Sequence, residues 1–398
     1  MTPHGAAGRI FLGSGMMMER GWRVFAGLVL AAGVLAGDAS VGGAQDTGAA
    51  GKKAKAPKTA KAPKAVDSAK ADGPQKPKKM PAPPLFASET PLAVTLTTNI
   101  KQIKKDKMAD APWRAATLSY AGTDGKTVML PVRIKTRGVW RLKHCDYPPI
   151  RIKVGDKAGK GTLFADIDEP KLVTYCRNQD AYEQYVLQEA QIYRMNRLLT
   201  DVSHKVRLVQ MSYADSATGK IEVTRYSFLV EDPAHVARRA GGAILDQKGA
   251  GPDDLDPAAS AIAFVFQYFI GNTDFSYAGL HNGEVVALPD GRNLPVSYDF
   301  DFAGVINATY AGVDPSLRVT RVRDRQFRGY CAHEAAYPRA LALFVAKREA
   351  LSALYRDEIG QLLPAGKVKQ TIGYFDDFYA NIATPKDAQR NLYADCVK

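Results

Sequence analysis

Alternating apolar and polar residues predict a strand-rich first half of the folded chain. The alternation is clearest over residues 128–134, where four apolar side chains fall on one face: Val128, Leu130, Val132 and Ile134. A period of two is typical of a strand with one buried face. The sequence predicts further strands over residues 92–96, 149–154, 206–213 and 221–230.

One long helix interrupts these strands, over residues 180–199. Asp180 is a candidate N-cap, and Glu183 stands at the capping-box position. Five side chains recur on one side at helical spacing: Tyr182, Val186, Glu189, Ala190 and Tyr193. We therefore expect Glu189 on or beside the apolar stripe of this helix.

The second half of the chain reads as mainly helical. Residues 256–270 predict a buried helix, with Asp256 as its N-cap, Pro257 at its first position and Gly271 after its end. A loop, GNTDFSYAGLHN, leads into a hairpin of residues 284–288 and 294–299, and helical periodicity returns over 338–363 and 366–382. This order predicts an α+β protein with two lobes.

Charge is concentrated before the folded part. The chain has 398 residues and a net charge of +13, of which residues 51–80 carry +8 through ten Lys and two Asp. Such a Lys/Ala/Pro tract cannot bury enough surface to fold, so we expect a disordered linker that could also tether the protein to an anionic surface. About +5 remains for the rest of the chain, a distribution that argues against specific nucleic-acid binding.

The N-terminus reads as a secretory signal. Residues 16–23 are net basic, and residues 24–37 are uncharged and too short for a usual membrane span. A retained single-span anchor is the alternative. We expect a signal peptide over 1–44, a linker over 45–84, a strand-rich N-lobe over 85–232 and a helical C-lobe over 233–398, exported to the periplasm, the envelope or the medium.

Four cysteines fit an exported chain. Cys145, Cys176, Cys331 and Cys396 form no CxxC pair, so zinc or thioredoxin-type chemistry is disfavoured. Three disulfide pairings are possible, and we favour the local one, Cys145–Cys176 with Cys331–Cys396. Four buried thiols are the alternative.

Several motifs, in this order, resemble the spore-coat CotH family of atypical kinases. They are Arg137-Gly138, the strand Pro149–Lys153, the segment SFLVED with Glu231, the loop with Asn272, Asp274, His281 and Asn282, and Tyr298–Asp301. The resemblance spans roughly residues 90–310. It implies a two-lobed protein-kinase-like fold, with a strand-rich N-lobe and a mainly helical C-lobe, and transfer of a phosphoryl group from ATP to a protein or other hydroxyl acceptor.

Phosphoryl transfer assigns a role to each candidate residue. It requires metal ions on the triphosphate, a cation on the phosphates and a carboxylate near the attacking hydroxyl. We expect Asp274 to be the catalytic carboxylate. Mg or Mn would bind Asp299 and Asn282. Asp301 would share the metal if that segment is extended, because it would then point the same way as Asp299. Lys153 would hold the phosphates, with Arg151 as the alternative, and Glu189 would pair with Lys153. Glu231 would lie at the nucleotide.

Two other interpretations stay open. The chain could be an inactive binding or structural module of the envelope, because retention of polar residues need not mean retained function. A metal-dependent phosphoesterase would usually need more His or Asp ligands. Five Arg in residues 318–328 could also contact an acidic substrate or form a solvated segment.

Overall fold

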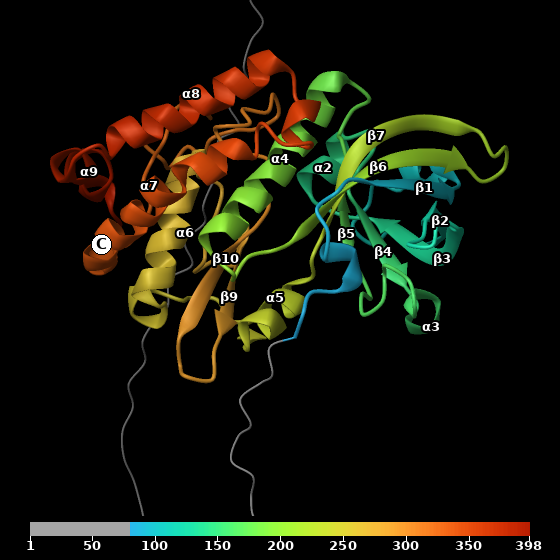
Figure 1. The fold of residues 1–398 in the computed structure, drawn as a ribbon, viewed down its shortest axis with the longest axis horizontal. Coiled ribbons are helices and arrows are strands. Elements are labelled where there is room, and N and C mark those ends of the chain that lie inside the picture. Colours follow the sequence, from blue (N-terminus) through green and yellow to red (C-terminus); the bar gives the residue numbers. More distant parts are fainter. Residues whose placement is uncertain (1–79) are drawn as a thin grey trace, which may run out of the picture. The chain divides into compact units, whose positions relative to one another are not determined.

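A seven-stranded barrel and a layer of long helices make up the described chain (Figure 1). The computed structural model describes residues 80–398, which belong to one compact unit. The predicted signal peptide and the linker as far as residue 79 lie outside the described residues. The last linker residues run into a short 3-10 helix, Pro84–Phe86.

The barrel strands follow the order β1-β2-β3-β4-β5-β7-β6, and a parallel pairing of β1 with β6 closes the ring. Their bounds are β1 Leu92–Thr98, β2 Arg114–Ala121, β3 Thr127–Thr136, β4 Ile150–Val154, β5 Lys171–Val173, β6 Val206–Asp215 and β7 Ile221–Val230. The prediction of a two-lobed kinase-like fold is therefore wrong, because its N-lobe would be an open sheet.

The error has a physical origin. Alternation identifies a strand and its buried face, but it does not identify the neighbouring strands. The closing pair joins Leu92–Thr98 to Val209–Asp215, more than a hundred residues further along the chain. Nothing in the local pattern of β1 encodes this partner, and two barrel strands, β2 and the short β5, were not predicted.

The two central helices begin and end close to where the sequence predicts. Helix α4 spans Asp180–Leu199 and α6 spans Pro257–Ile270, with Asp256 accepting from the Ala259 N–H as its cap. Gly271 ends α6 at φ +68°, in the left-handed region that favours glycine. The capping box of α4 is not formed, because Gln179 is the N-cap and the Glu183 carboxylate accepts from Tyr226 N–H instead.

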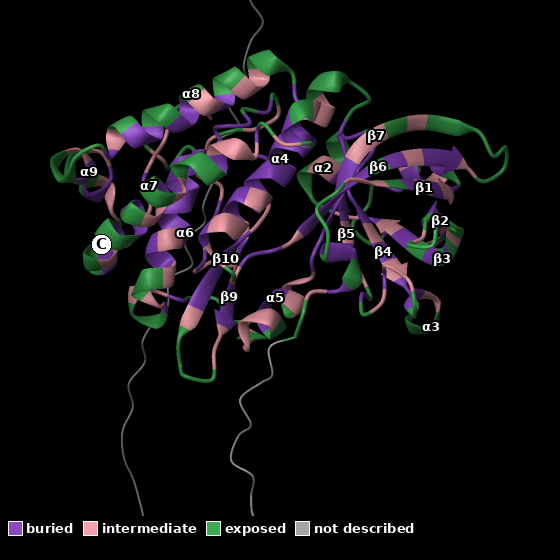
Figure 2. Cartoon of the chain, in the orientation of Figure 1, coloured by how far each residue is buried: buried purple, intermediate pink, exposed green. Residues whose placement is uncertain are grey.

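The remaining elements of the described chain include seven further α-helices and a small sheet that contains the hairpin. The helices are α1 Ile100–Lys105, α2 Trp140–His144, α3 Asp156–Gly159, α5 Pro233–Ala240, α7 Tyr337–Ala353, α8 Ala365–Asn381 and α9 Pro385–Asn391. A small sheet has the order β10-β9-β8, with β8 Ala243–Ile244, β9 Gly283–Ala287 and β10 Asn293–Ser297. Figure 2 shows that burial follows α4, α6 and the hairpin, whereas α8 and α9 keep exposed outer faces.

Both predicted disulfides are confirmed. Cys145 bonds Cys176, and Cys331 bonds Cys396. Two disulfides indicate an oxidising environment, hence an exported protein. Within residues 80–398, each helix is too short or too polar to cross a bilayer.

Candidate active site

The candidate site lies at the open end of the β9–β10 hairpin. Asn282 precedes β9, and Asp299 follows β10 by two residues. Gly283 pairs with Ser297, and the Tyr298 N–H donates to the Asn282 carbonyl at 3.2 Å. The hairpin register therefore brings together the loop before β9 and the acidic segment after β10, as the sequence led us to expect.

Asp274 is held in place by two neighbours from its own loop. Its carboxylate lies 2.8 Å from His281 Nε2 and 3.0 Å from Asn282 Nδ2. The Asn282 amide also donates to the Asp274 carbonyl, and a bridge between Ser276 and His281 closes the loop. Asp274 is thus oriented while remaining partly exposed, as a group that meets a substrate must be.

Asp299 and Asn282 have strained backbones. Their φ angles are +59° and +49°, a region that non-glycine residues seldom occupy. The Asp299 N–H donates to the Tyr193 hydroxyl at 2.8 Å. In residues 80–398 no hydrogen bond or ion pair reaches the Asp299 carboxylate. Strain of this kind clusters at functional sites, and here it presents an unengaged carboxylate.

Asp301 lies deeper than Asp299. The left-handed Asp299 breaks the extended segment, so the condition under which both acids were expected to point the same way is not met. Asp301 is 6% exposed and lies 3.9 Å from an Arg141 nitrogen. Burial raises the pKa of Asp301 to about 7; Asp299 adds to the rise, while Arg141 and a hydrogen bond with Tyr310 oppose it.

Glu189 approaches the same acids from α4. It is 1% exposed, and its carboxylate accepts from the Phe300 N–H at 3.3 Å. Burial raises the pKa of Glu189 well above its ordinary value, and the charges of Asp301 and Asp299 raise it further. Buried acids with raised pKa values are a frequent property of active sites.

Two arginines from the segment after β3 partly balance these acids. Burial lowers the Arg137 pKa, and the charge of Asp299 opposes this shift. Arg141 donates to the Thr174 carbonyl. The Cys145–Cys176 disulfide links the same two segments, because Cys145 follows Arg141 by four residues and Cys176 follows Thr174 by two. The Nε atoms of Arg137 and Arg141 are buried without a hydrogen-bond partner among the described residues.

The predicted phosphate-binding cations face a different partner. Lys153 pairs with Glu169 at 3.1 Å, rather than with Glu189, and Arg151 approaches Glu169 at 3.3 Å. The expected Lys153–Glu189 pair is therefore replaced, because both β4 cations point outward from the barrel while Glu189 lies under Phe300.

Glu231 is fully buried and its carboxylate is fully engaged. It accepts two bonds of 2.8 Å from Arg239 and one of 2.9 Å from the Lys205 N–H. This side chain holds α5 to the end of β7. Three of its roughly four acceptor positions are occupied and the side chain is buried, so its predicted role at the nucleotide has no support in these contacts.

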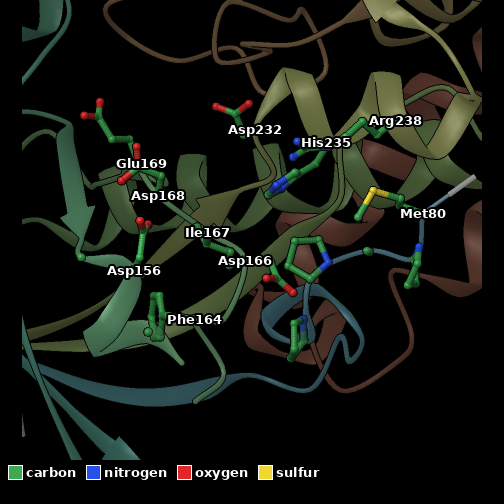
Figure 3. Close-up of a pocket in the computed structure, with 16 residues that line it drawn as sticks. Met80, Asp156, Phe164, Asp166, Ile167, Asp168, Glu169, Asp232, His235 and Arg238 are labelled. Carbon is green, nitrogen blue, oxygen red and sulfur yellow. The ribbon is translucent and has the colours of Figure 1, made fainter. Parts of the chain in front are cut away.

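Two cavities lie near these residues. One, of about 470 Å³, is lined by Asp274, His281, Phe302, Asp314 and Arg328 among others. A larger one, of about 850 Å³, lies between the chain at Met80, the loop after β4, and α5 (Figure 3). Five acids contribute to the lining of the larger cavity: Asp156, Asp166, Asp168, Glu169 and Asp232. Only the smaller cavity contains a predicted site residue.

The donor set suits a hard cation without forming a complete cage. Within residues 80–398, no three His, Cys, Asp or Glu side chains are grouped as metal ligands. The Asp299 carboxylate and the Asn282 amide oxygen are unengaged oxygen donors, which Mg²⁺ prefers. Mg²⁺ usually takes only one or two carboxylates from a protein and the rest from water and phosphate. The residues present fit such a metal.

The arginines of residues 318–328 are mostly structural. Arg325 donates to the carbonyls of Tyr268, Phe269 and Tyr374, and Arg328 donates to those of Thr273 and Phe275. Arg321 pairs with Asp324 and Arg318 with Asp395. Arg328 thus supports the loop on both sides of Asp274 and also lines the smaller cavity, while Arg318 and Arg321 remain largely exposed, so contact with an acidic substrate stays a prediction.

Four residues complete the site beyond those assigned from sequence. They are Arg137, Arg141, Tyr193 and Tyr310. Arg137 stood in a recognised motif but received no role, and the four-residue spacing to Arg141 was a usable signal. Tyr193 lay on the predicted face of α4 beside Glu189. Tyr310 gave no signal, because only the tertiary fold brings it to Asp301.

Comparison with known proteins leaves the family open. No protein-family model matches this chain, and no curated protein matches it. Membership of the CotH family, which the motifs resemble, therefore remains a prediction.

Proposed function

We propose that this protein is an exported phosphotransferase that moves a phosphoryl group from a nucleoside triphosphate such as ATP to a hydroxyl acceptor, with Mg or Mn. One observation carries the proposal: an oriented, partly exposed Asp274 lies on the same loop as Asn282, which adjoins the strained and unengaged Asp299. The two-lobed kinase architecture is no part of it. We also propose that the N-terminal signal peptide directs export.

Asp274 acts on the acceptor. Its hydrogen bonds with His281 and Asn282 fix the carboxylate at the cavity of about 470 Å³, where a hydroxyl group can reach it. The hydroxyl oxygen bonds to the terminal phosphorus, the bond from that phosphorus to its bridging oxygen breaks, and the proton passes to Asp274. An envelope protein or another hydroxyl compound is the acceptor.

The other residues hold charge. Asp299 and Asn282 would hold the metal, which supplies neutralisation of the phosphate oxygens when bound. Arg137 and Arg141 offset the charges of Asp299 and Asp301. Glu189 and Tyr193 position the backbone of the acidic segment through Phe300 and Asp299.

A thermal-shift titration with ATP and Mg or Mn tests the proposal. The wild-type protein should show a saturable, metal-dependent rise in Tm, because binding to the folded state stabilises it by mass action. Asp299→Ala should lose the rise while still unfolding cooperatively. Asp290→Ala, an exposed acid at the far end of the same hairpin, is the matched control and should keep it.

The same titration weighs a second candidate, an envelope binding module without turnover. The deep burial of Glu189 and Asp301 favours it, since both acids are engaged within the protein. No rise in Tm at millimolar nucleotide in a well-folded sample would reject the phosphotransferase and favour the binding module.

A further inference from the structure

A row of cations crosses three barrel strands. Lys135 on β3 stands directly opposite Arg151 on β4, and Arg151 stands directly opposite Lys171 on β5. We call Lys135, Arg151 and Lys171 the basic row. Residues opposite each other on antiparallel strands lie about 5 Å apart at Cβ, and like charges there are unfavourable. Neighbouring strands can therefore tolerate such a row only at a cost.

The described chain supplies little compensation for the basic row. Glu169 contacts Arg151 at 3.3 Å, but it also pairs with Lys153 from the adjoining row. Within residues 80–398 no ion pair joins Lys135 or Lys171 to an acid. The Arg151 Nε is buried without a hydrogen-bond partner there. The three cations therefore share part of the Glu169 carboxylate, and the charges of Glu284 and Asp232 act on Lys171 without forming an ion pair with it.

Both ends of the basic row are defined by aromatic rings. The Lys135 and Lys153 ammonium groups lie 5.5 and 5.9 Å from the Trp113 ring centre. At the other end, the Lys171 ammonium lies 5.6 Å from the ring centre of Tyr298, the residue before Asp299. Burial lowers the Lys171 pKa, and the neighbouring Arg137 lowers it further. The row thus leads along the barrel toward the candidate active site.

We propose that the basic row binds a linear polyphosphate chain, with one end directed by Lys171 toward Asp299. Adjacent strands are about 4.8 Å apart, so the three cations repeat along a line at a spacing that a chain of linked phosphates can follow. Lysine and arginine both bind phosphate oxygens, and arginine does so with two parallel donors. The direction of the chain rests on the proposed function, whereas the binding itself does not.

The same chemistry has two sources, inorganic polyphosphate and the triphosphate of a nucleotide. Isothermal titration of the full chain without metal distinguishes them, using sodium tripolyphosphate, ATP and orthophosphate as probes. Equal affinity for tripolyphosphate and ATP supports recognition of the chain alone. Affinity for ATP at least tenfold higher supports a nucleotide. Binding of orthophosphate as tight as that of tripolyphosphate would overturn the proposal, because a single anion site would then suffice.

Matched variants separate the basic row from general charge. Lys135→Gln with Lys171→Gln should weaken tripolyphosphate binding about tenfold or more, since two charge-assisted contacts are lost. Lys101→Gln with Lys105→Gln removes the same charge from exposed positions on α1 and should change the affinity little. Equal losses in the two double variants, or no binding by the wild-type protein, would reject the basic row as the site. If the basic row is rejected in this way but ATP with metal still raises the Tm, the proposed function stands without the basic row.

Discussion

At the residue scale, the site combines acids that differ in exposure and engagement. Asp274 is oriented by hydrogen bonds, Asp299 is unengaged, and Asp301 and Glu189 are buried. The sequence YDFDF does not reveal which aspartate is buried. The backbone turns at Asp299, where φ is +59°, and Asp301 is buried while Asp299 is partly exposed.

Asp301 should make stability depend on pH. Its pKa is raised from an ordinary 3.8 to about 7, so between these values the folded protein binds a proton that the unfolded chain does not. The free energy of unfolding should therefore fall as pH rises from about 4 to about 7, with a slope of up to about 1.4 kcal/mol per pH unit for this one proton.

Urea denaturation across that pH range measures the effect. Asp301→Asn should show a flatter profile than the wild-type protein, and the exposed control Asp253→Asn should follow the wild type. Parallel profiles for Asp301→Asn and the wild-type protein would show that Asp301 titrates normally.

Gly271 is a second test at this scale. A Cβ there would meet the Tyr374 hydroxyl and the backbone of Gly304, and its φ is +68°. Gly271→Ala should cost about 2–4 kcal/mol in the free energy of unfolding, from backbone strain and overpacking together. Gly291→Ala has a similar φ of +86° but open space around it, so it should cost only about 1 kcal/mol. Comparable losses would mean that the packing contributes nothing.

At the element scale, periodicity located the long helices and most of the long strands, but it missed β2, the shortest strands and the short helices, and it did not identify strand partners. Strand β7 and helix α4 begin and end at the predicted residues, because both patterns run uninterrupted between polar turns. The three-residue strand β5 is too short to show a period, yet it carries Lys171 and closes the basic row. Lys153 was chosen for its place on a strand, and only the pairing with Glu169 shows where it points.

Relief of repulsion in the basic row should stabilise the free protein. Lys171→Gln removes one of the like charges opposite Arg151, so the free energy of unfolding should rise by about 0.2–1 kcal/mol at low salt. Chemical denaturation at low and high salt measures this, because salt screens the repulsion. Destabilisation by Lys171→Gln at low salt would show that the aliphatic stem or an attraction dominates instead.

At the scale of the whole molecule, the two disulfides should have separable effects. They close loops of 31 and 65 residues, for which the chain-entropy estimate is about 4 kcal/mol each. Cys331→Ala with Cys396→Ala should lower stability only. Cys145→Ala with Cys176→Ala should also weaken metal-dependent ATP binding, because it frees the segment that holds Arg141 against Thr174.

Thermal shifts of both double variants, with and without ATP and Mg, check this difference. The ligand-free Tm should fall in each, while the increment due to ligand should shrink only without Cys145–Cys176. An undiminished increment in that variant would mean that Arg141 keeps its position without the covalent link.

The parallel pairing of β1 with β6 has a consequence for the order of folding. The ring cannot close until β6, which begins more than a hundred residues after β1 ends, has joined the chain already folded. Contacts between such distant segments form slowly, because the entropy cost of closing a long loop comes before the strand pairing can offset it. Until then one edge of β1 offers unpaired backbone groups to other chains. The free edge of β1 is therefore the part of the described barrel most open to pairing with another chain until folding is complete.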